Sequence, residues 1–276
     1  MNSGIANHGG TVNVNHSAVG PNATYHASGR SSRPERLAAL GIITMKPLET
    51  QAVRDELGLV PTRAAGLHFH EGTVDGMRVA ALQTLAQGNR SVIMACQNLQ
   101  RIFNPPVIVL TGIAGGIHKD VELDDVVIAT SVIYYDLRKL TPDGTRHRSD
   151  EKPSAAHVVN AVNHFFVDKG EPAAISGFRV HGSPIGSGEA VIAEEESEIV
   201  RHLQAYNDKV LAVDMEAGGF TQAFYEQAGD HTAQGWVVVR GISDHAGADR
   251  HYGHHEPAAR NAAVAVRKLM PYLQLD

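Results

Sequence analysis

Apolar residues follow two kinds of spacing from about Leu37 onwards. Short runs rich in β-branched residues predict buried strands, whereas apolar residues at every third or fourth position predict amphipathic helices. The expected strands are 39–45, 67–72, 77–83, 106–111, 126–131, 210–213 and 236–242. The expected helices are 49–57, 89–103, 155–167, 193–206, 215–227 and 257–272. Alternating strands and helices favour an α/β fold, with a central mixed sheet covered by helices on both faces.

The first 36 residues have a different composition. They are rich in Gly, Asn, His and Ser, and the short alternation TVNV at 11–14 cannot bury enough surface to form a core. We therefore expect a flexible leader over 1–36 and a single folded domain over 37–276. The alternative is an adaptor that binds a protein partner, because GGTVNV and AVGPNAT resemble short segments found beside effector domains in bacterial conflict systems.

The charge and the cysteine content limit the partners and the cellular compartment that we expect for the protein. Lys plus Arg is 24 and Asp plus Glu is 30, which gives a formal net charge of −6. Such a chain has no global field that attracts a nucleic acid polymer. Cys96 is the only cysteine, so an intrachain disulfide is excluded and a reducing compartment is favoured. Because we see neither a signal peptide nor an apolar run of roughly 20 residues, we expect a cytoplasmic protein with no membrane association.

Three motifs each come at the end of an expected strand: TGIAGG (111–116), VDMEAGG (213–219) and RGISDHAG (240–247). Ligands of α/β proteins gather at the carboxyl ends of strands. Glycines let the backbone approach a ligand, Glu216 could accept hydrogen bonds from a vicinal diol, and Asp244 could donate a proton. Taken singly, each motif also fits a structural role: a turn, acids that complement a helix dipole, or Asp244 as a helix cap or a partner of Arg240.

Taken together and in this order, the three motifs resemble the nucleoside phosphorylase/nucleosidase superfamily, and most closely the methylthioadenosine/S-adenosylhomocysteine nucleosidases. GIITMKPLE (41–49) and IGSGEAVI (185–192) agree with the same families. The resemblance covers 37–276. It implies a nucleoside phosphorylase-like fold and cleavage of the N-glycosidic bond of a purine nucleoside or nucleotide, without a cofactor or a metal.

The resemblance also implies roles for individual residues. Asp244 would protonate the purine at N7 as it leaves, Glu49 would activate the attacking water, and Glu216 would hold the ribose hydroxyls. Glycosidic cleavage needs these two functions, leaving-group protonation and a positioned nucleophile. The pocket would be completed by Met215 against the sugar, Ala114 and Gly115 beside base and sugar, Val191 and Ile192 around the base, and Arg240 and Ser243 orienting the acids. Tyr135, in the segment that leads into the basic residues of 138–148, is a further candidate for contact with the substrate.

The nucleophile is favoured to be water. Hexameric phosphorylases of the superfamily carry an arginine where this chain has Leu110, and their glycine-and-arginine phosphate loop is replaced by 44–48. A phosphate dianion without a guanidinium would be poorly paired. A purine nucleoside phosphorylase nevertheless stays an alternative. So does a non-catalytic nucleotide sensor, although a sensor has no need of Glu49, Glu216 and Asp244 together.

Two further segments leave alternatives open. The basic residues of 138–148 fit either a solvated loop or a pocket for a phosphate chain. With a phosphate pocket, the substrate would be a nucleotide such as AMP or ATP, and the protein would be an effector in bacterial defence. The histidines of 251–255 have no spaced carboxylate or cysteine beside them, so we expect no metal there. Members of the superfamily commonly pair so that one subunit completes the pocket of the other, and we therefore expect at least a homodimer.

Overall fold

The computed structural model describes residues 37–194, 197–227, 233–246 and 252–274. The predicted leader lies outside these ranges. Most strands of the described residues join one mixed sheet, whose main path runs β10-β7-β13-β14-β5-β1-β4-β3-β2, with β15 paired to β5 and β6, and β6 paired to β12. Its strands are β1 (Leu40–Thr44), β2 (Val60–Ala64), β3 (Leu67–Val74), β4 (Met77–Gln83), β5 (Val107–Gly116), β6 (Val126–Ala129), β7 (Ser131–Tyr134), β10 (Asp150–Pro153), β11 (Ala173–Ile175), β12 (Phe178–Gly182), β13 (Ile185–Ser187), β14 (Ala212–Asp214) and β15 (Gly235–Asp244).

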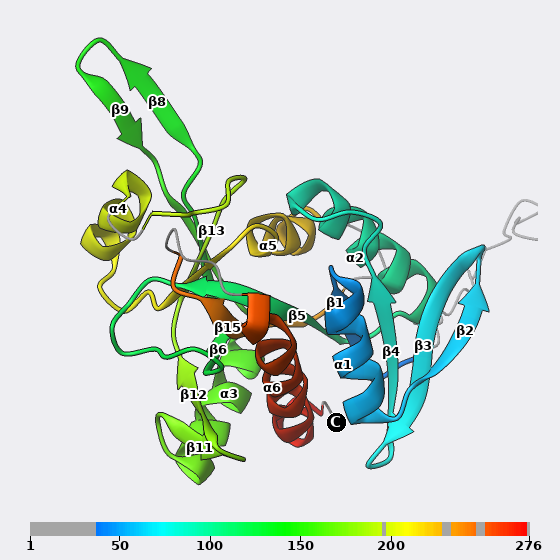
Figure 1. The fold of residues 1–276 in the computed structure, drawn as a ribbon. Coiled ribbons are helices and arrows are strands. Elements are labelled where there is room, and N and C mark those ends of the chain that lie inside the picture. The colour runs from blue at the N-terminus through cyan, green and yellow to red at the C-terminus, as the bar shows by residue number, and fades with distance from the viewer. Residues whose placement is uncertain (1–36, 195–196, 228–232, 247–251, 275–276) are drawn as a thin grey trace, which may run out of the picture. The chain divides into compact units, whose positions relative to one another are not determined.

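Helices cover both faces of this sheet (Figure 1). They are α1 (Pro47–Leu57), α2 (Asn89–Phe103), α3 (Ala156–Lys169), α4 (Glu198–Tyr206), α5 (Ala217–Tyr225) and α6 (His255–Leu269), with short 3₁₀ turns at Tyr252–His254 and Met270–Tyr272. Of the helices in the described ranges, none combines the length and the hydropathy that a bilayer crossing requires.

The central strands divide the core between the two faces, because successive side chains of a strand point to opposite sides. On β5, Val107 and Val109 join the apolar cluster that includes residues of α1, α3 and α6. Ile108 and Leu110 join the cluster that includes residues of α2 and α5. The predicted α/β class, with a mixed sheet flanked by helices, is confirmed.

Two predicted boundaries are corrected, one by long-range strand pairing and one by helix capping. TGIAGG does not form a turn, because β5 continues to Gly116 and is paired on one side with β15 and on the other with β14. The predicted helix at 193–206 begins only at Glu198, since the Ser197 Oγ caps it by accepting a hydrogen bond from the Val200 N–H. Strand pairing and capping thus override local propensity at both places.

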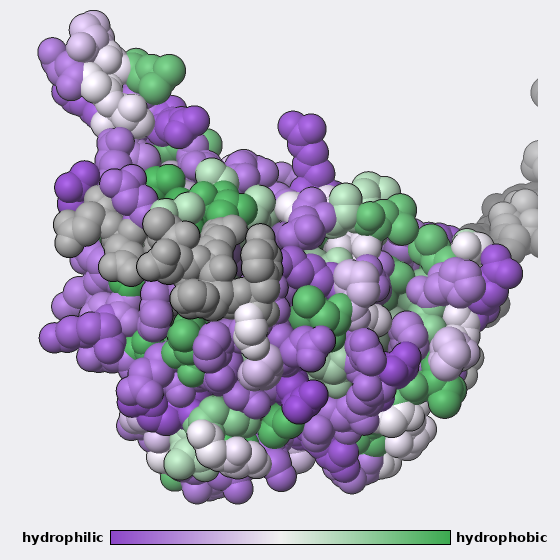
Figure 2. All heavy atoms as spheres, viewed as in Figure 1, coloured by the Kyte–Doolittle hydropathy of each residue, from purple (hydrophilic) through white to green (hydrophobic). Residues whose placement is uncertain are grey.

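The basic segment 138–148 is a hairpin rather than a simple loop. β8 (Arg138–Thr141) and β9 (Gly144–His147) pair with each other as a separate two-stranded sheet, which stands away from the central sheet in Figure 1. Figure 2 shows a mostly polar surface here with an apolar area on one side, and Leu140 is 76% exposed.

The close approach of β15 to α6 depends on a glycine. A Cβ added at Gly241 would lie 2.0 Å from the Ala258 carbonyl oxygen, which is backbone and cannot move independently. The facing side of α6 carries further small buried residues, Ala259 and Ala262. The absence of a side chain at Gly241 therefore sets how near α6 lies to the strand that ends in Asp244.

We expect Gly241→Ala to lower the free energy of unfolding by about 1–3 kcal/mol, the usual cost of overpacking a filled core. Urea denaturation followed by circular dichroism measures this change. Gly253→Ala is the matched control, because a Cβ at Gly253 meets nothing within 4 Å. That variant should stay within about 0.5 kcal/mol of the wild type. Equal stabilities for the two variants would show that β15 and α6 are not in tight contact.

Candidate active site

Strand pairing brings the three predicted motifs together. Ala114 and Gly115 near the end of β5 are paired with Ile242 and Asp244 of β15, and Gly115 is also paired with Val213 of β14. The register shifts between Ile242 and Asp244, an irregularity of the kind that re-aims side chains near functional sites. The motifs therefore end side by side at one edge of the sheet.

A cavity of about 300 Å³ lies at this edge. The predicted site residues that line it are Ala114, Gly115, Val191, Ile192, Met215, Glu216, Ser243 and Asp244. The residues that sequence analysis did not assign to it are Lys46, Gln87, Ile113, Ala190, Val213, Asp214 and His255. Lys46 belongs to the GIITMKPLE motif and could have been found there, whereas Gln87 lies outside every motif.

Arg240 is fully buried beneath the cavity and holds two carboxylates. Its Nε donates to the Asp214 Oδ2 at 2.9 Å, and its Nη2 contacts the same oxygen as well as the Glu216 Oε2 at 3.3 Å. Burial alone would lower the pKa of Arg240, but the adjacent Asp214 and Glu216 charges raise it, so the guanidinium stays protonated. Arg240 was expected to orient the acids, and the acids it contacts are this pair rather than Asp244.

Asp214 lies at the start of α5, where the sequence left open that the acids of this motif complement the helix dipole. Its Oδ1 accepts hydrogen bonds from the Glu216 and Ala217 N–H groups, at 3.3 and 3.1 Å, at the start of α5. An acid at this position also complements the helix dipole. Asp214 thus fixes the turn that carries Met215 and Glu216 into the cavity.

The Glu216 carboxylate shares the Arg240 guanidinium with Asp214 and is almost fully buried. The Gly88 N–H donates to its Oε1 at 3.0 Å, and Arg240 reaches its Oε2. Burial raises the pKa of Glu216, because the nearby Arg240 charge is shared with Asp214 and offsets only part of the lost hydration. The carboxylate faces the cavity and can accept hydrogen bonds from hydroxyl groups.

Asp244 lies at the end of β15 and has no ion-pair partner among the described residues. Its Oδ1 accepts the Ala246 N–H at 2.9 Å, and its Oδ2 accepts the Ser243 hydroxyl at 3.2 Å. The apolar side chains of Val191 and Ile192 line the same cavity. A carboxyl group beside an apolar slot can donate a proton to a flat heterocycle.

Glu49 lies behind the lining residues rather than among them. It is 2% exposed, its Oε2 accepts the Met45 and Lys46 N–H groups, each at 2.8 Å, and its Oε1 accepts the Ile113 N–H at 3.0 Å. A Cβ at Gly112 would lie 2.5 Å from the Glu49 Oε1 and 2.7 Å from the Arg240 Nη1. Glu49 and Arg240 therefore approach each other over a residue that has no side chain.

Tyr135 supports the cavity wall from behind. Its side chain is fully buried in the cluster that contains Ile192 and Val213, and burial raises the pKa of its phenol. It packs so closely on Gly188 that a Cβ there would lie 2.3 Å from the ring. The structure therefore places Tyr135 in the packing around the cavity and not on its surface, where it was expected to contact a ligand.

The basic and histidine-rich segments have different positions. Of the residues described for this chain, none from the β8–β9 hairpin lines the cavity. The histidine run begins at His251, outside the described residues; His254 pairs with the Asp124 carboxylate at 3.0 Å, and His255 lines the cavity. Within the described ranges, no group of three or more His, Cys, Asp or Glu side chains is placed to hold a metal ion.

A family model described as "Phosphorylase superfamily" matches residues 39–271. The chain belongs to the phosphorylase superfamily. This confirms the superfamily expected from the motifs, and the match lies within the predicted domain.

Known proteins resemble the chain over most of their length. A 5′-methylthioadenosine/S-adenosylhomocysteine nucleosidase of Exiguobacterium sp. is 30% identical over 208 residues, which cover 75% of this chain and 85% of that protein. The crystal structure of such a nucleosidase from Colwellia psychrerythraea, in complex with adenine, has a TM-score of 0.68 at 24% identity and covers 86% of this chain and 96% of its own. The futalosine hydrolase of Helicobacter pylori has the same TM-score at 15% identity, with 85% and 98% covered.

The raised pKa of Glu216 predicts how stability depends on pH. A carboxyl group whose pKa is higher in the folded state stabilises that state below its unfolded pKa of about 4.3, and this contribution is lost as pH rises through the folded pKa. The unfolding free energy of the wild type minus that of Glu216→Gln should therefore fall as pH rises from 4 towards neutrality. Urea denaturation of both proteins across this range measures the difference. A difference that grows with pH would mean that Arg240 outweighs burial and lowers the pKa.

Proposed function

We propose that this protein is a purine nucleosidase, which hydrolyses the N-glycosidic bond to give a free base and a free sugar. One observation carries the proposal: a single cavity combines Asp244, beside an apolar slot, with Glu216, a carboxylate held by a buried arginine. The first suits a heterocyclic leaving group and the second suits a diol. The nucleosidase relatives, one of them crystallised with adenine, support this assignment.

The base end of the cavity supplies the acid. Val191 and Ile192 enclose the purine, and Asp244 protonates its N7 as the glycosidic bond breaks. The Ser243 hydroxyl and the Ala246 N–H hold the carboxyl group in place. Protonation prevents the base from leaving as an anion and typically contributes about 10²–10⁴-fold to the rate.

The sugar end binds the ribose and stabilises the positive charge that develops on it. The Glu216 carboxylate accepts hydrogen bonds from the ribose hydroxyls, and Met215 packs against the ring. Cleavage passes through an oxocarbenium-like state. The negative charge of Glu216 is favourable in that state, because the cavity floor is buried and electrostatic interactions there are weakly screened.

Glu49 orients the attacking water. Among the described residues, its Oε1 accepts a hydrogen bond from the Ile113 N–H, and a carboxylate oxygen can accept two. The remaining lone pair is available to a water molecule at the cavity floor. Three backbone donors fix the carboxylate, so the water would be held in one orientation.

Water is favoured over phosphate as the nucleophile. The arginine position of the hexameric phosphorylases is Leu110, which is fully buried inside β5 in an apolar cluster. The loop between β1 and α1 also lacks an arginine. No guanidinium is therefore supplied by either segment to pair with a phosphate dianion at the anomeric carbon.

The biological setting follows from the same assignment. We infer a cytoplasmic enzyme that acts on a small purine ligand and forms at least a homodimer, since pairing is common in the superfamily. A protein partner that binds the leader would recruit or regulate the nucleosidase, as expected of an effector in bacterial defence.

Incubation with a panel of purine nucleosides and nucleotides tests the function. The wild type should release free base, measured by liquid chromatography, in buffer that contains no inorganic phosphate. Asp244→Asn should lower the rate by at least about 10²-fold, because an amide cannot protonate N7.

The matched control is Asp208→Asn, which removes an exposed carboxylate after α4 and should leave turnover unchanged. Normal turnover by Asp244→Asn would refute the acid role. Base release only when phosphate is added would refute hydrolysis.

Glu49→Gln should also abolish turnover, while adenine still binds in isothermal titration calorimetry. The amide keeps the shape of the side chain but cannot accept a proton from water. Glu56→Gln, on the same helix, is the control and should turn over normally. An unchanged rate in Glu49→Gln would show that another group activates the water.

A further inference from the structure

One cation on the cavity wall has no carboxylate partner among the described residues. Lys46 is half-buried and lines the cavity, but none of the ion pairs formed by these residues includes it. The acids nearby have other partners: Arg240 holds Asp214 and Glu216, and backbone N–H groups hold Glu49. A half-buried ammonium on a cavity wall is well placed to form a charge-assisted hydrogen bond with an anionic ligand.

Contacts made by neighbouring residues place Lys46 at the Glu216 end of the cavity. Met45, the residue before it, contacts the Arg240 Nη1 through its sulfur at 3.9 Å. Gln87, another lining residue, precedes Gly88, whose N–H donates to Glu216. Lys46 and Gln87 therefore lie on the side where the sugar hydroxyls bind.

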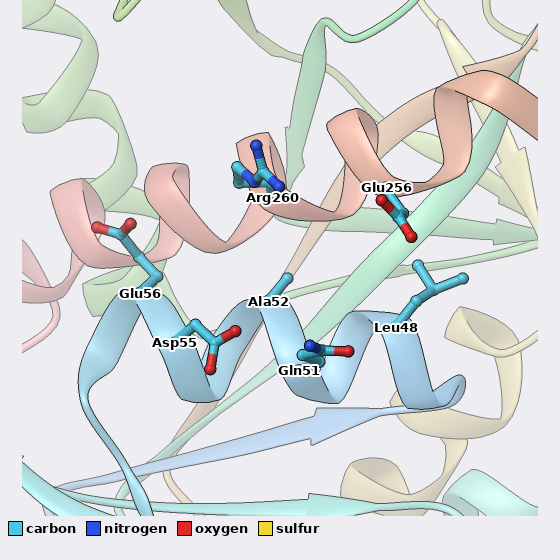
Figure 3. A pocket seen from close by; sticks show the side chains of 7 residues that line it. All are labelled: Leu48, Gln51, Ala52, Asp55, Glu56, Glu256 and Arg260. Atoms are coloured by element: carbon cyan, nitrogen blue, oxygen red, sulfur yellow. The ribbon is translucent and has the colours of Figure 1, made fainter.

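His255 brings a second basic side chain to the same region. It is the first residue of α6 and lines the cavity. Figure 3, which shows the neighbouring groove between α1 and α6, has Leu48 near the start of α1 pointing towards Glu256 at the start of α6. Lys46 precedes Leu48 by two residues and His255 precedes Glu256 by one, so both lie close to a pair of residues that face each other. The amino end of α6 also carries a partial positive charge, which favours an anion.

We propose that Lys46 and His255 bind a phosphate group on the 5′ position of the ribose, so that the preferred substrate is a purine nucleotide. This inference rests on the proposed nucleosidase function and specifies its substrate class. With the ring hydroxyls on Glu216, the 5′ substituent extends towards the lysine and the helix amino end. A phosphate there forms charge-assisted hydrogen bonds, whereas an uncharged thioether would leave the ammonium without a counter-charge.

Inorganic phosphate has the same chemistry and is the other possible source of the anion. As a nucleophile it would bind below the anomeric carbon and stimulate cleavage of uncharged nucleosides. A nucleotide phosphate instead raises the rate for the substrate that carries it. The two sources therefore give different kinetic results.

The experiment compares kcat/KM for base release from AMP, adenosine and 5′-methylthioadenosine, with and without inorganic phosphate, using the full chain. We expect the wild type to prefer AMP, without stimulation by phosphate. Lys46→Met should lower the ratio of kcat/KM for AMP to that for 5′-methylthioadenosine on the order of 10- to 100-fold, the usual effect of losing a hydrogen bond to a charged group. Lys46→Arg should largely retain the ratio.

Lys268→Met is the control, because this exposed lysine is thirteen residues further along α6, or about 20 Å away. Its ratio should equal that of the wild type. An unchanged ratio in Lys46→Met, a wild-type preference for 5′-methylthioadenosine, or phosphate stimulation of adenosine cleavage that Lys46→Met removes would each overturn the proposal.

Failure of the underlying function is separable from failure of this inference. Release of base from the nucleosides but not from AMP would leave the nucleosidase intact and remove the nucleotide preference. If no substrate releases base, the nucleosidase proposal fails, and AMP affinity still tests the phosphate site. Calorimetry then compares the AMP affinity of Asp244→Asn with that of the double variant that also carries Lys46→Met. We expect the second change to weaken AMP binding at least about 10-fold. Equal affinities of the two proteins would refute the phosphate site.

Discussion

The buried guanidinium of Arg240 is the interaction on which the site depends. It is fully excluded from solvent and joins the last part of β15 to Asp214 and Glu216, at the turn between β14 and α5. Removing one partner of a buried ion pair typically costs about 3–5 kcal/mol, because the other charge is left uncompensated. Because moving Arg240 away would leave the buried carboxylates uncompensated, β15 and the start of α5 are fixed with respect to each other.

Glycines on neighbouring positions make room for that arrangement. Gly112 lets Glu49 come within reach of Arg240, and Gly241 lets the backbone of α6 lie directly on β15. The result is a cavity whose two ends differ in chemistry. Glu216, which faces it, is tied to the buried cation. Asp244 lies past the irregularity in β15, and among the described residues its hydrogen-bond donors are neutral. The two carboxyl groups thus have different surroundings, in line with the different roles proposed for them.

The sequence predicted the structure best where the pattern of residues is local, as in the regular apolar spacing of a helix or in a short motif. The apolar spacing of 89–103 predicted α2 with the bounds that the structure has, and the glycine-rich motifs identified the superfamily. Each of these motifs comes at the end of a strongly apolar strand, and ligands of α/β proteins gather at the carboxyl ends of strands, so the sheet edge that carries the site could also be foreseen.

Features that depend on distant partners could not be predicted in this way. β2 and β10 are short and largely exposed, so they have no run of buried residues. The pair of Asp214 and Arg240 joins residues 26 apart, and nothing near Asp214 distinguishes it from Glu216 as the structural acid. Tyr135 looked like a ligand contact because it adjoins basic residues, but the packing on Gly188 buries it. Lys46 was visible in its motif, yet only the folded chain shows that it faces the cavity without a carboxylate.

The central claim is that water attacks the sugar while a base, protonated by the protein, departs. Turnover of a purine substrate in water enriched in oxygen-18, with mass spectrometry of both products, tests this most directly. The account predicts one heavy oxygen at the anomeric carbon of a free sugar and none in the released base. A sugar that carries phosphate at that carbon, or a free sugar without the heavy oxygen after a single turnover, would contradict it.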